Sequence, residues 1–146
     1  VRRPTSGAGF ITDSDDSVGR IIVGTSNNDT LSGLGGNDEF RPGGGDDTIA
    51  GGAGDDTISI SSNSDVTSGA NYSGGAGTDT LSITSTSVTK LEFPDNGTSL
   101  ATLEVWNVSG GASSGVEITT NATSIFFSGL TTIIAGNGSG DNLKIG

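Results

Sequence analysis

Aspartate recurs every nine residues in the first half of the chain. Residues 24–59 divide without a gap into four frames of nine, and the sixth place of every frame is an aspartate. These aspartates are Asp29, Asp38, Asp47 and Asp56. An apolar residue follows each of them two places later: Leu31, Phe40, Ile49 and Ile58. A short fixed period of this kind is the signature of a repeat architecture in which each unit stacks on its neighbours.

The frame continues beyond these four copies in a weaker form. Residues 60–68 keep Asp65 but have lost the glycines, and five further residues, 69–73, interrupt the pattern. The frame 74–82 then restores it with Asp79.

Each frame predicts one turn followed by one short strand. Its glycine-rich half, such as residues 43–45, permits positive φ and a tight bend. Its second half is β-prone and offers one apolar side chain for burial. Two frames complete one coil of a flattened roll. The predicted fold class is therefore all-β: a right-handed parallel β-roll that continues into a parallel β-helix, or β-solenoid.

Stacking of such coils predicts acidic pairs along both edges of the roll. Asp29 is expected beside Asp47 on one edge and Asp38 beside Asp56 on the other, at the strand spacing of about 4.8 Å. Two unneutralised carboxylates this close repel each other by about 1 kcal/mol even in water. Ca²⁺ takes about six to eight oxygen ligands and accepts both carboxylates and carbonyls, whereas Mg²⁺ demands a stricter octahedron. The sequence therefore predicts several bound Ca²⁺ ions.

The repeat resembles the glycine- and aspartate-rich nonapeptide of the RTX family, G-G-x-G-x-D-x-U-x, in which U is apolar. The resemblance covers residues 24–82 well and the rest of the chain weakly. It implies a calcium-binding β-roll, export by a type I secretion machine as an unfolded chain, and carbonyl ligands from the first, second and fourth places of the frame. The candidate metal ligands are then Asp29, Asp38, Asp47, Asp56, Asp65, Asp79, Gly36, Gly43, Gly45, Gly51, Gly52 and Gly54.

Some frames depart from the glycine pattern. Thr25, Leu34 and Pro42 stand where the family has glycine, and the backbone angles that the turn requires are then harder to reach. We expect the site at Asp29 to be the least secure, and residues 61–63 argue against a regular site at Asp65.

Composition excludes several other classes. A net charge of −11 with only six Lys and Arg repels phosphate backbones, so no nucleic-acid partner is expected. The absence of cysteine excludes disulfides and thiolate metal sites. No apolar run is long enough to insert into a membrane, and residues 1–20 lack the order of a signal peptide. Because the chain starts without Met, we expect it to be a fragment of a longer protein.

Three segments are predicted within one continuous solenoid. Residues 1–20 form a linker that leads into a first strand at 20–23, residues 21–82 form the calcium-binding roll, and residues 83–146 form a Ser/Thr-rich continuation. Short β-prone clusters recur in this continuation at 91–93, 103–105, 116–118, 125–127, 133–134 and 143–145. Their spacing also fits an antiparallel sandwich, but the open end of a roll favours another parallel layer. This region resembles the strand repeats of bacterial surface-layer and other cell-surface proteins.

Three aromatic residues pose questions of burial. Phe126 and Phe127 point to opposite faces of a strand, so one of them is either covered within the chain or available to a partner. We expect Trp106, the only tryptophan, to be a core residue rather than a platform for sugar stacking.

Catalysis is not expected. Residues 111–115 match G-x-S-x-G, but a serine hydrolase needs a base and the chain has no histidine. The carboxylate pairs Asp46-Asp47 and Asp55-Asp56 repeat with the frame, which favours a structural role, with the first member of each pair facing solvent.

These observations predict an extracellular calcium-binding structural module of a bacterial cell-surface protein, of the surface-layer or adhesin type, that folds and assembles on Ca²⁺. Its expected partners are further copies or neighbouring domains of the same surface protein, and a cell-surface polysaccharide is a further candidate. The alternative is a C-terminal carrier and folding module of an enzyme or toxin exported by type I secretion.

Overall fold

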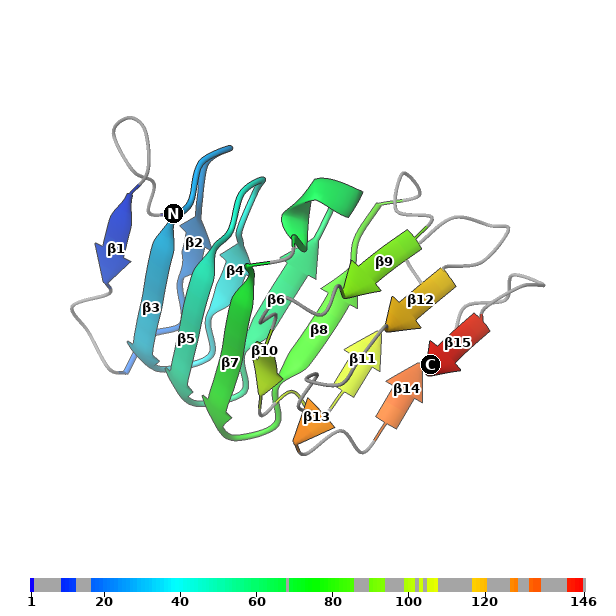
Figure 1. Cartoon of the computed structure of the whole chain (residues 1–146). Coiled ribbons are helices and arrows are strands. Elements are labelled where there is room, and N and C mark those ends of the chain that lie inside the picture. The colour runs from blue at the N-terminus through cyan, green and yellow to red at the C-terminus, as the bar shows by residue number, and fades with distance from the viewer. Residues whose placement is uncertain are drawn as a thin grey trace.

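The nine-residue frames become alternating turns and parallel strands in the computed structural model. The structure describes residues 1, 9–12, 17–67, 69–85, 90–93, 99–101, 103, 105–107, 117–120, 127–128, 132–134 and 142–145. All strand pairs in this part of the chain are parallel, and its only helix is the three-residue 3-10 turn η1 (Asn63–Asp65). The predicted all-β roll and solenoid is confirmed (Figure 1).

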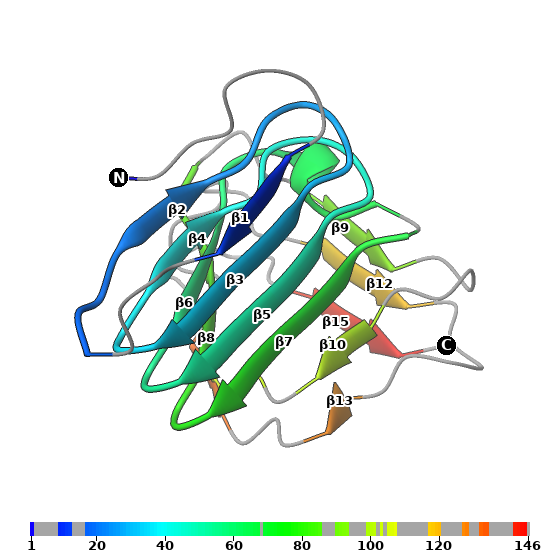
Figure 2. The ribbon, with the colours of Figure 1, turned by 90° about the vertical axis from the view of Figure 1, so that its left-hand side faces the viewer.

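The chain alternates between two six-stranded sheets that face each other. The first sheet contains β1 (Phe10–Thr12), β3 (Thr30–Gly35), β5 (Thr48–Ala53), β7 (Asn71–Ala76), β10 (Ser99–Ala101) and β13 (Phe127–Ser128). The second sheet contains β2 (Ile21–Val23), β4 (Glu39–Arg41), β6 (Thr57–Ile60), β8 (Thr80–Ile83), β11 (Val105–Asn107) and β14 (Thr132–Ile134). Figure 2 shows the first sheet from outside, with its strands stacked side by side.

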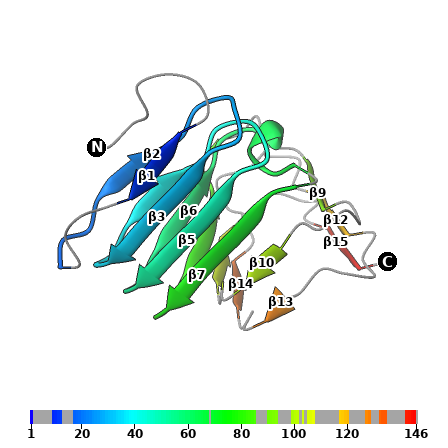
Figure 3. The same ribbon diagram turned by 60° about the vertical axis from the view of Figure 1, so that its left-hand side comes forward.

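A third sheet begins beyond the repeats. Its strands are β9 (Lys90–Phe93), β12 (Glu117–Thr120) and β15 (Asn142–Ile145). From β9 onward each coil therefore has three strands instead of two, and the flat roll continues as a three-sided helix (Figures 1 and 3). The strands pair in parallel, so the antiparallel sandwich is excluded for this part of the chain. The division at residues 20 and 82 stays a prediction.

Rows of inward-pointing side chains fill the space between the two main sheets. The apolar residue of each frame lies level with that of the next coil, as in the row Leu31, Ile49 and Tyr72. The opposite row contains Ile22, Phe40, Ile58, Leu81 and Trp106. All of these side chains are almost completely buried, which confirms Trp106 as a core residue. Each frame supplies one apolar residue to these rows, and β6 and β8 each add a second buried residue, Ile60 and Ile83, which lie level with each other.

The structure adds a strand that the repeat pattern does not reveal. Residues 10–12 form β1 within the segment expected to be a linker, and Ile11 lies level with Leu31. Gly9 stands where later coils have aspartate, so this coil lacks the signal on which the frames were identified. Two predicted features lie outside the described residues: Phe126 and the motif at 111–115.

Candidate metal site

The nine-residue period of the frames places one aspartate directly before most strands of the roll. We call the turns that lead into β3, β5 and β7 the first edge (residues 24–29, 42–47, 61–67 and 69–70) and those that lead into β4, β6 and β8 the second edge (residues 36–38, 54–56 and 77–79). The first edge contains Asp29, Asp47 and Asp65, and the second contains Asp38, Asp56 and Asp79. All six side chains are buried.

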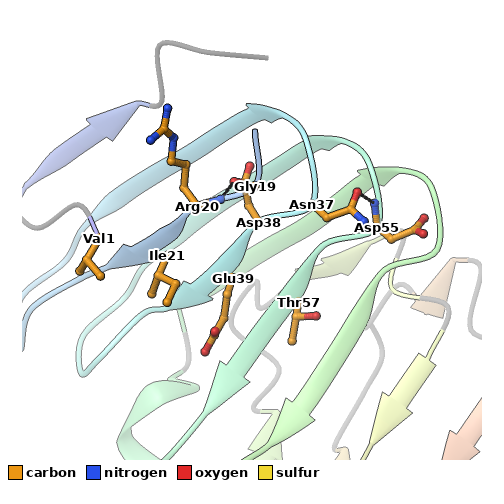
Figure 4. Close-up of a pocket in the computed structure, with 9 residues that line it drawn as sticks. All are labelled: Val1, Gly19, Arg20, Ile21, Asn37, Asp38, Glu39, Asp55 and Thr57. Carbon is orange, nitrogen blue, oxygen red and sulfur yellow. Dashed lines mark hydrogen bonds between the residues drawn. The ribbon is translucent and has the colours of Figure 1, made fainter. Parts of the chain in front are cut away.

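One oxygen of each stacked carboxylate holds two coils together. The backbone N–H of Asp29 donates to Oδ1 of Asp47, and that of Asp38 donates to Oδ1 of Asp56, both over 2.8 Å. The N–H of Asp56 donates in the same way to Oδ1 of Asp79. On the second edge this ladder begins with the N–H of Arg20, which donates to Oδ1 of Asp38 (Figure 4). The predicted neighbours, Asp29 with Asp47 and Asp38 with Asp56, are confirmed.

The other carboxylate oxygen of Asp47 and of Asp56, Oδ2, has no hydrogen-bond partner in the protein. In both residues this oxygen is buried. A buried carboxylate oxygen without a partner is costly, because it has lost its water and gained nothing in return. A cation beside it removes that cost, so these two atoms fit a metal ligand on each edge.

Glycine opens the space that such a cation needs on the second edge. A β-carbon added to Gly51 would lie 2.3 Å from Oδ2 of Asp56 and 2.2 Å from the carbonyl oxygen of Gly74. A β-carbon added to Gly33 would lie 2.2 Å from Oδ2 of Asp38 and 2.5 Å from the carbonyl oxygen of Gly51. In both places a carboxylate oxygen and a carbonyl oxygen of the next coil face one small space. An all-oxygen donor set of this kind suits Ca²⁺.

The remaining predicted glycines shape the turns. Five of them have positive φ: Gly36, Gly43, Gly45, Gly52 and Gly54. A β-carbon at Gly52 would lie 2.2 Å from the carbonyl oxygen of Leu34, one coil earlier, so the close approach of the coils also requires glycine there. Leu34 itself reaches φ 69° in spite of its side chain, and the turn forms in that frame as well.

In two of the predicted ligands, Asp29 and Asp65, Oδ2 is not vacant. Oδ2 of Asp29 accepts the N–H of Thr25 over 2.6 Å and its hydroxyl over 2.9 Å. Oδ2 of Asp65 accepts the N–H of Ser61 over 2.7 Å, its hydroxyl over 2.9 Å and the N–H of Ser62. The expectation that these two frames depart from a regular site agrees with these bonds.

Asp65 is also displaced from the stack of aspartates. The residue directly before β7 is Ala70, and the N–H of Asn71 donates to the carbonyl oxygen of Asp47. At this level of the stack, Ala70 therefore stands in place of an aspartate. The five inserted residues bring Tyr72 to the core position in place of Thr67, and η1 takes up the extra length. The hydroxyl of Tyr72 donates to the carbonyl oxygen of Asp65 and ties the enlarged turn to the core.

Burial changes the titration of the two vacant carboxylates. It raises the pKa of Asp47 to about 7, and the negative charges of Asp29 and Asp65 add to the effect, while the N–H of Asp29 opposes it. Burial likewise raises the pKa of Asp56 to about 6, with a further contribution from Asp79. A neighbouring cation would favour the charged form of both groups, so binding of a metal and loss of protons are coupled here.

A second ladder runs along the edges at the fifth place of the frames, and the sequence reasoning missed it. The N–H of Asp46 donates to Oδ1 of Asn28 over 3.0 Å. The N–H of Asp55 donates to Oδ1 of Asn37 over the same distance (Figure 4). Oδ1 of Asp55 in turn accepts the N–H of Thr78. These side chains are exposed, as expected of the first member of each acidic pair, but they also connect the coils. Their recurrence at one place of the frame was the available signal.

The acidic side chains are spread along the edges rather than gathered in one centre. Among the described residues, no three of His, Cys, Asp and Glu form a cluster that could hold a metal by side chains alone. The oxygens that face the spaces beside Gly33 and Gly51 come from one carboxylate and one backbone carbonyl each. The two edges thus define a parallel β-roll whose candidate cation sites are shared between coils.

Comparison with known families agrees with this geometry. Residues 23–58 match the model of the RTX calcium-binding nonapeptide repeat, in four copies. No curated protein and no solved structure matches the chain. Residues 23–58 are therefore RTX nonapeptide repeats, and Ca²⁺ is the ion that such repeats bind.

Proposed function

We propose that the chain is an extracellular structural module of a bacterial cell-surface protein, of the surface-layer or adhesin type, that folds and assembles when it binds Ca²⁺. The family match already shows calcium-binding repeats, and such repeats are typical of secreted proteins. Folding that depends on Ca²⁺ is supported by the buried Oδ2 atoms of Asp47 and Asp56, which accept no hydrogen bond from the protein. A roll that buries such atoms needs a cation to be stable.

The residues of the second edge indicate how calcium and folding are linked. Oδ2 of Asp56 and the carbonyl oxygen of Gly74 would hold the ion beside Gly51, and the ion would supply the positive charge that the stacked carboxylates lack. Because the two oxygens belong to different coils, they come together only in the folded roll. Binding energy is then folding energy, and the chain stays open where calcium is scarce and folds where it is abundant.

The solenoid offers places for the proposed partners. β1 and β2 are the outermost strands of their sheets (Figure 3). The side chain of Phe10, the first residue of β1, is largely exposed. Strands with a free edge favour pairing with further strands, which supports a neighbouring domain or a second copy as the partner. The outward side chains of the roll include many hydroxyls, among them Thr30, Thr48 and Ser73, and these suit a cell-surface polysaccharide.

We further propose that the chain is not itself an enzyme. Its buried aspartates bond the coils to one another through Oδ1, as Asp47 and Asp56 do, so their repetition has a structural cause.

The residues that the structure describes contain no helix with the length and apolar character needed to cross a bilayer.

The second candidate is a carrier module that folds on calcium and belongs to a secreted enzyme or toxin. The family match covers residues 23–58, and calcium-driven folding of this segment requires no assembly, which supports a carrier module.

Circular dichroism and light scattering on the same sample, titrated from chelator into millimolar Ca²⁺ with Mg²⁺ as control, decide between the two. Folding that is accompanied by growth into large particles supports the assembling surface module. Folding into a monomer overturns it in favour of the carrier, and the absence of any calcium response contradicts both.

A further inference from the structure

The second residue of each frame separates two kinds of aspartate. In the frames of Asp47 and Asp56 this residue is Gly43 or Gly52, with positive φ, and Oδ2 of the aspartate is buried without a hydrogen bond. In the frames of Asp29 and Asp65 it is a hydroxyl residue instead. Both kinds of aspartate are equally buried, so exposure to solvent does not explain the difference.

The hydroxyl residues make the same arrangement twice. Thr25 and Ser61 each lie four residues before their aspartate, and each donates both its N–H and its hydroxyl to Oδ2, at 2.6 to 2.7 Å and 2.9 Å. The two turns differ greatly in their other residues and in their length, because one of them includes η1. The recurrence therefore follows from the hydroxyl residue itself.

These donors supply what the other aspartates lack. Two charge-assisted hydrogen bonds stabilise a buried carboxylate oxygen and offset the cost of removing it from water. The hydroxyl oxygen of Thr25 is itself engaged, because it accepts the N–H of Asn27 over 3.1 Å. A cation at Oδ2 of Asp29 would have to break this network and to displace a side chain that the glycine frames do not have.

We propose that Thr25 and Ser61 take the place of the cation at Asp29 and Asp65, so that calcium is bound only in frames whose second residue leaves Oδ2 vacant. This inference rests on the proposed calcium-driven folding and adds which frames take part in it. Both hydroxyl frames lie on the first edge and flank Asp47. The first edge then offers only Asp47 to a cation, and the chain binds fewer ions than its six buried aspartates suggest.

The test is the number of calcium ions bound per chain at saturation, measured by equilibrium dialysis with radioactive calcium on the whole chain. Asp29→Asn and Asp56→Asn form a matched pair, because asparagine keeps Oδ1 for the ladder and replaces only Oδ2 with a nitrogen. We expect Asp29→Asn to bind as many ions as the unchanged chain and Asp56→Asn to bind at least one fewer. Equal losses in the two variants, or no loss in Asp56→Asn, would overturn the inference.

A second pair of variants guards against loss of folding in Asp29→Asn. Thr25→Gly frees Oδ2 of Asp29 and restores the glycine of the second place, so we expect at least one additional bound ion. Thr25→Ser keeps the hydroxyl, and the number is expected to stay unchanged. No gain in Thr25→Gly overturns the inference. If the unchanged chain binds no calcium at all, the proposed function itself fails, which is a different result from either of these.

Discussion

The two edges of the roll are built from the same nine-residue frame, yet they differ in what they can bind. On the second edge, Asp38, Asp56 and Asp79 form an unbroken ladder of Oδ1 bonds, and the glycines beside it leave space at Oδ2. On the first edge, the ladder from Asp29 stops at Asp47, because the next residue in the stack is Ala70. The period of a repeat thus fixes where carboxylates stack, while the residues around each one decide whether a cation is needed.

The largest effect is expected from filling a cation space on the second edge. Gly51→Ala places a β-carbon 2.2 to 2.3 Å from two ligand oxygens, so we expect it to destabilise the calcium-bound roll by about 2 to 3 kcal/mol and to raise the calcium concentration needed for folding. Gly44→Ala on the first edge is the matched control, because its β-carbon meets nothing closer than 3.7 Å. Calcium titrations followed by circular dichroism compare the two, and equal effects would contradict the difference between the edges.

Acid is expected to replace calcium in part. Because burial raises the pKa of Asp47 to about 7 and that of Asp56 to about 6, the folded roll binds protons more tightly than the unfolded chain. The calcium-free protein should be most stable below the ordinary pKa of aspartate, and that stability should disappear as pH rises through about 6 to 7.

Circular dichroism in chelator between pH 4 and 8 measures this dependence. In saturating calcium the same scan should give the opposite slope, with folding lost as the pH falls, because protons then compete with the ion. Folding in chelator that is best at pH 8 would show that the buried carboxylates need no neutralisation.

A smaller effect is expected at the enlarged turn of the first edge. Tyr72→Phe removes the hydroxyl that donates to the carbonyl oxygen of Asp65, and it should lower the free energy of unfolding by about 1 to 2 kcal/mol. Urea denaturation in saturating calcium measures the loss. The number of bound ions should not change, because the turn is held by hydrogen bonds, and a lost ion would place a cation at this turn after all.

The smallest effect is expected at Leu34, which precedes the second edge. A left-handed conformation costs a residue with a β-carbon about 1 to 2 kcal/mol, and part of this is regained in Leu34→Gly. We expect stabilisation of up to about 1 kcal/mol in urea denaturation, because the side chain of Leu34 is exposed and little burial is lost. Leu34→Ala keeps the β-carbon and should show no gain; a gain of the same size there would exclude backbone strain as the cause.

Much of the fold could be predicted because the repeat carries it in each frame. Asp38 and Phe40, for example, indicate a turn and a strand. An aspartate and an apolar residue recur eighteen residues later, and this recurrence predicts the parallel stacking. The coil that contains β1 was missed because Gly9 stands where aspartate would have marked it. Counting in nines cannot tell where the five inserted residues are absorbed, so the pairing of Tyr72 with Ile49 could not be predicted from the sequence.

The sequence by itself determined that this chain is a calcium-binding repeat, since aspartate and an apolar residue at a period of nine specify both the core row and the acidic edges. Only the tertiary structure decided what each carboxylate does. Oδ1 is used between coils, and whether Oδ2 is vacant depends on donors that approach it in three dimensions, such as the hydroxyl of Thr25. The physical reason is that hydrogen bonding and burial of a single oxygen depend on contacts within the folded turn and between coils, whose geometry a linear pattern does not record.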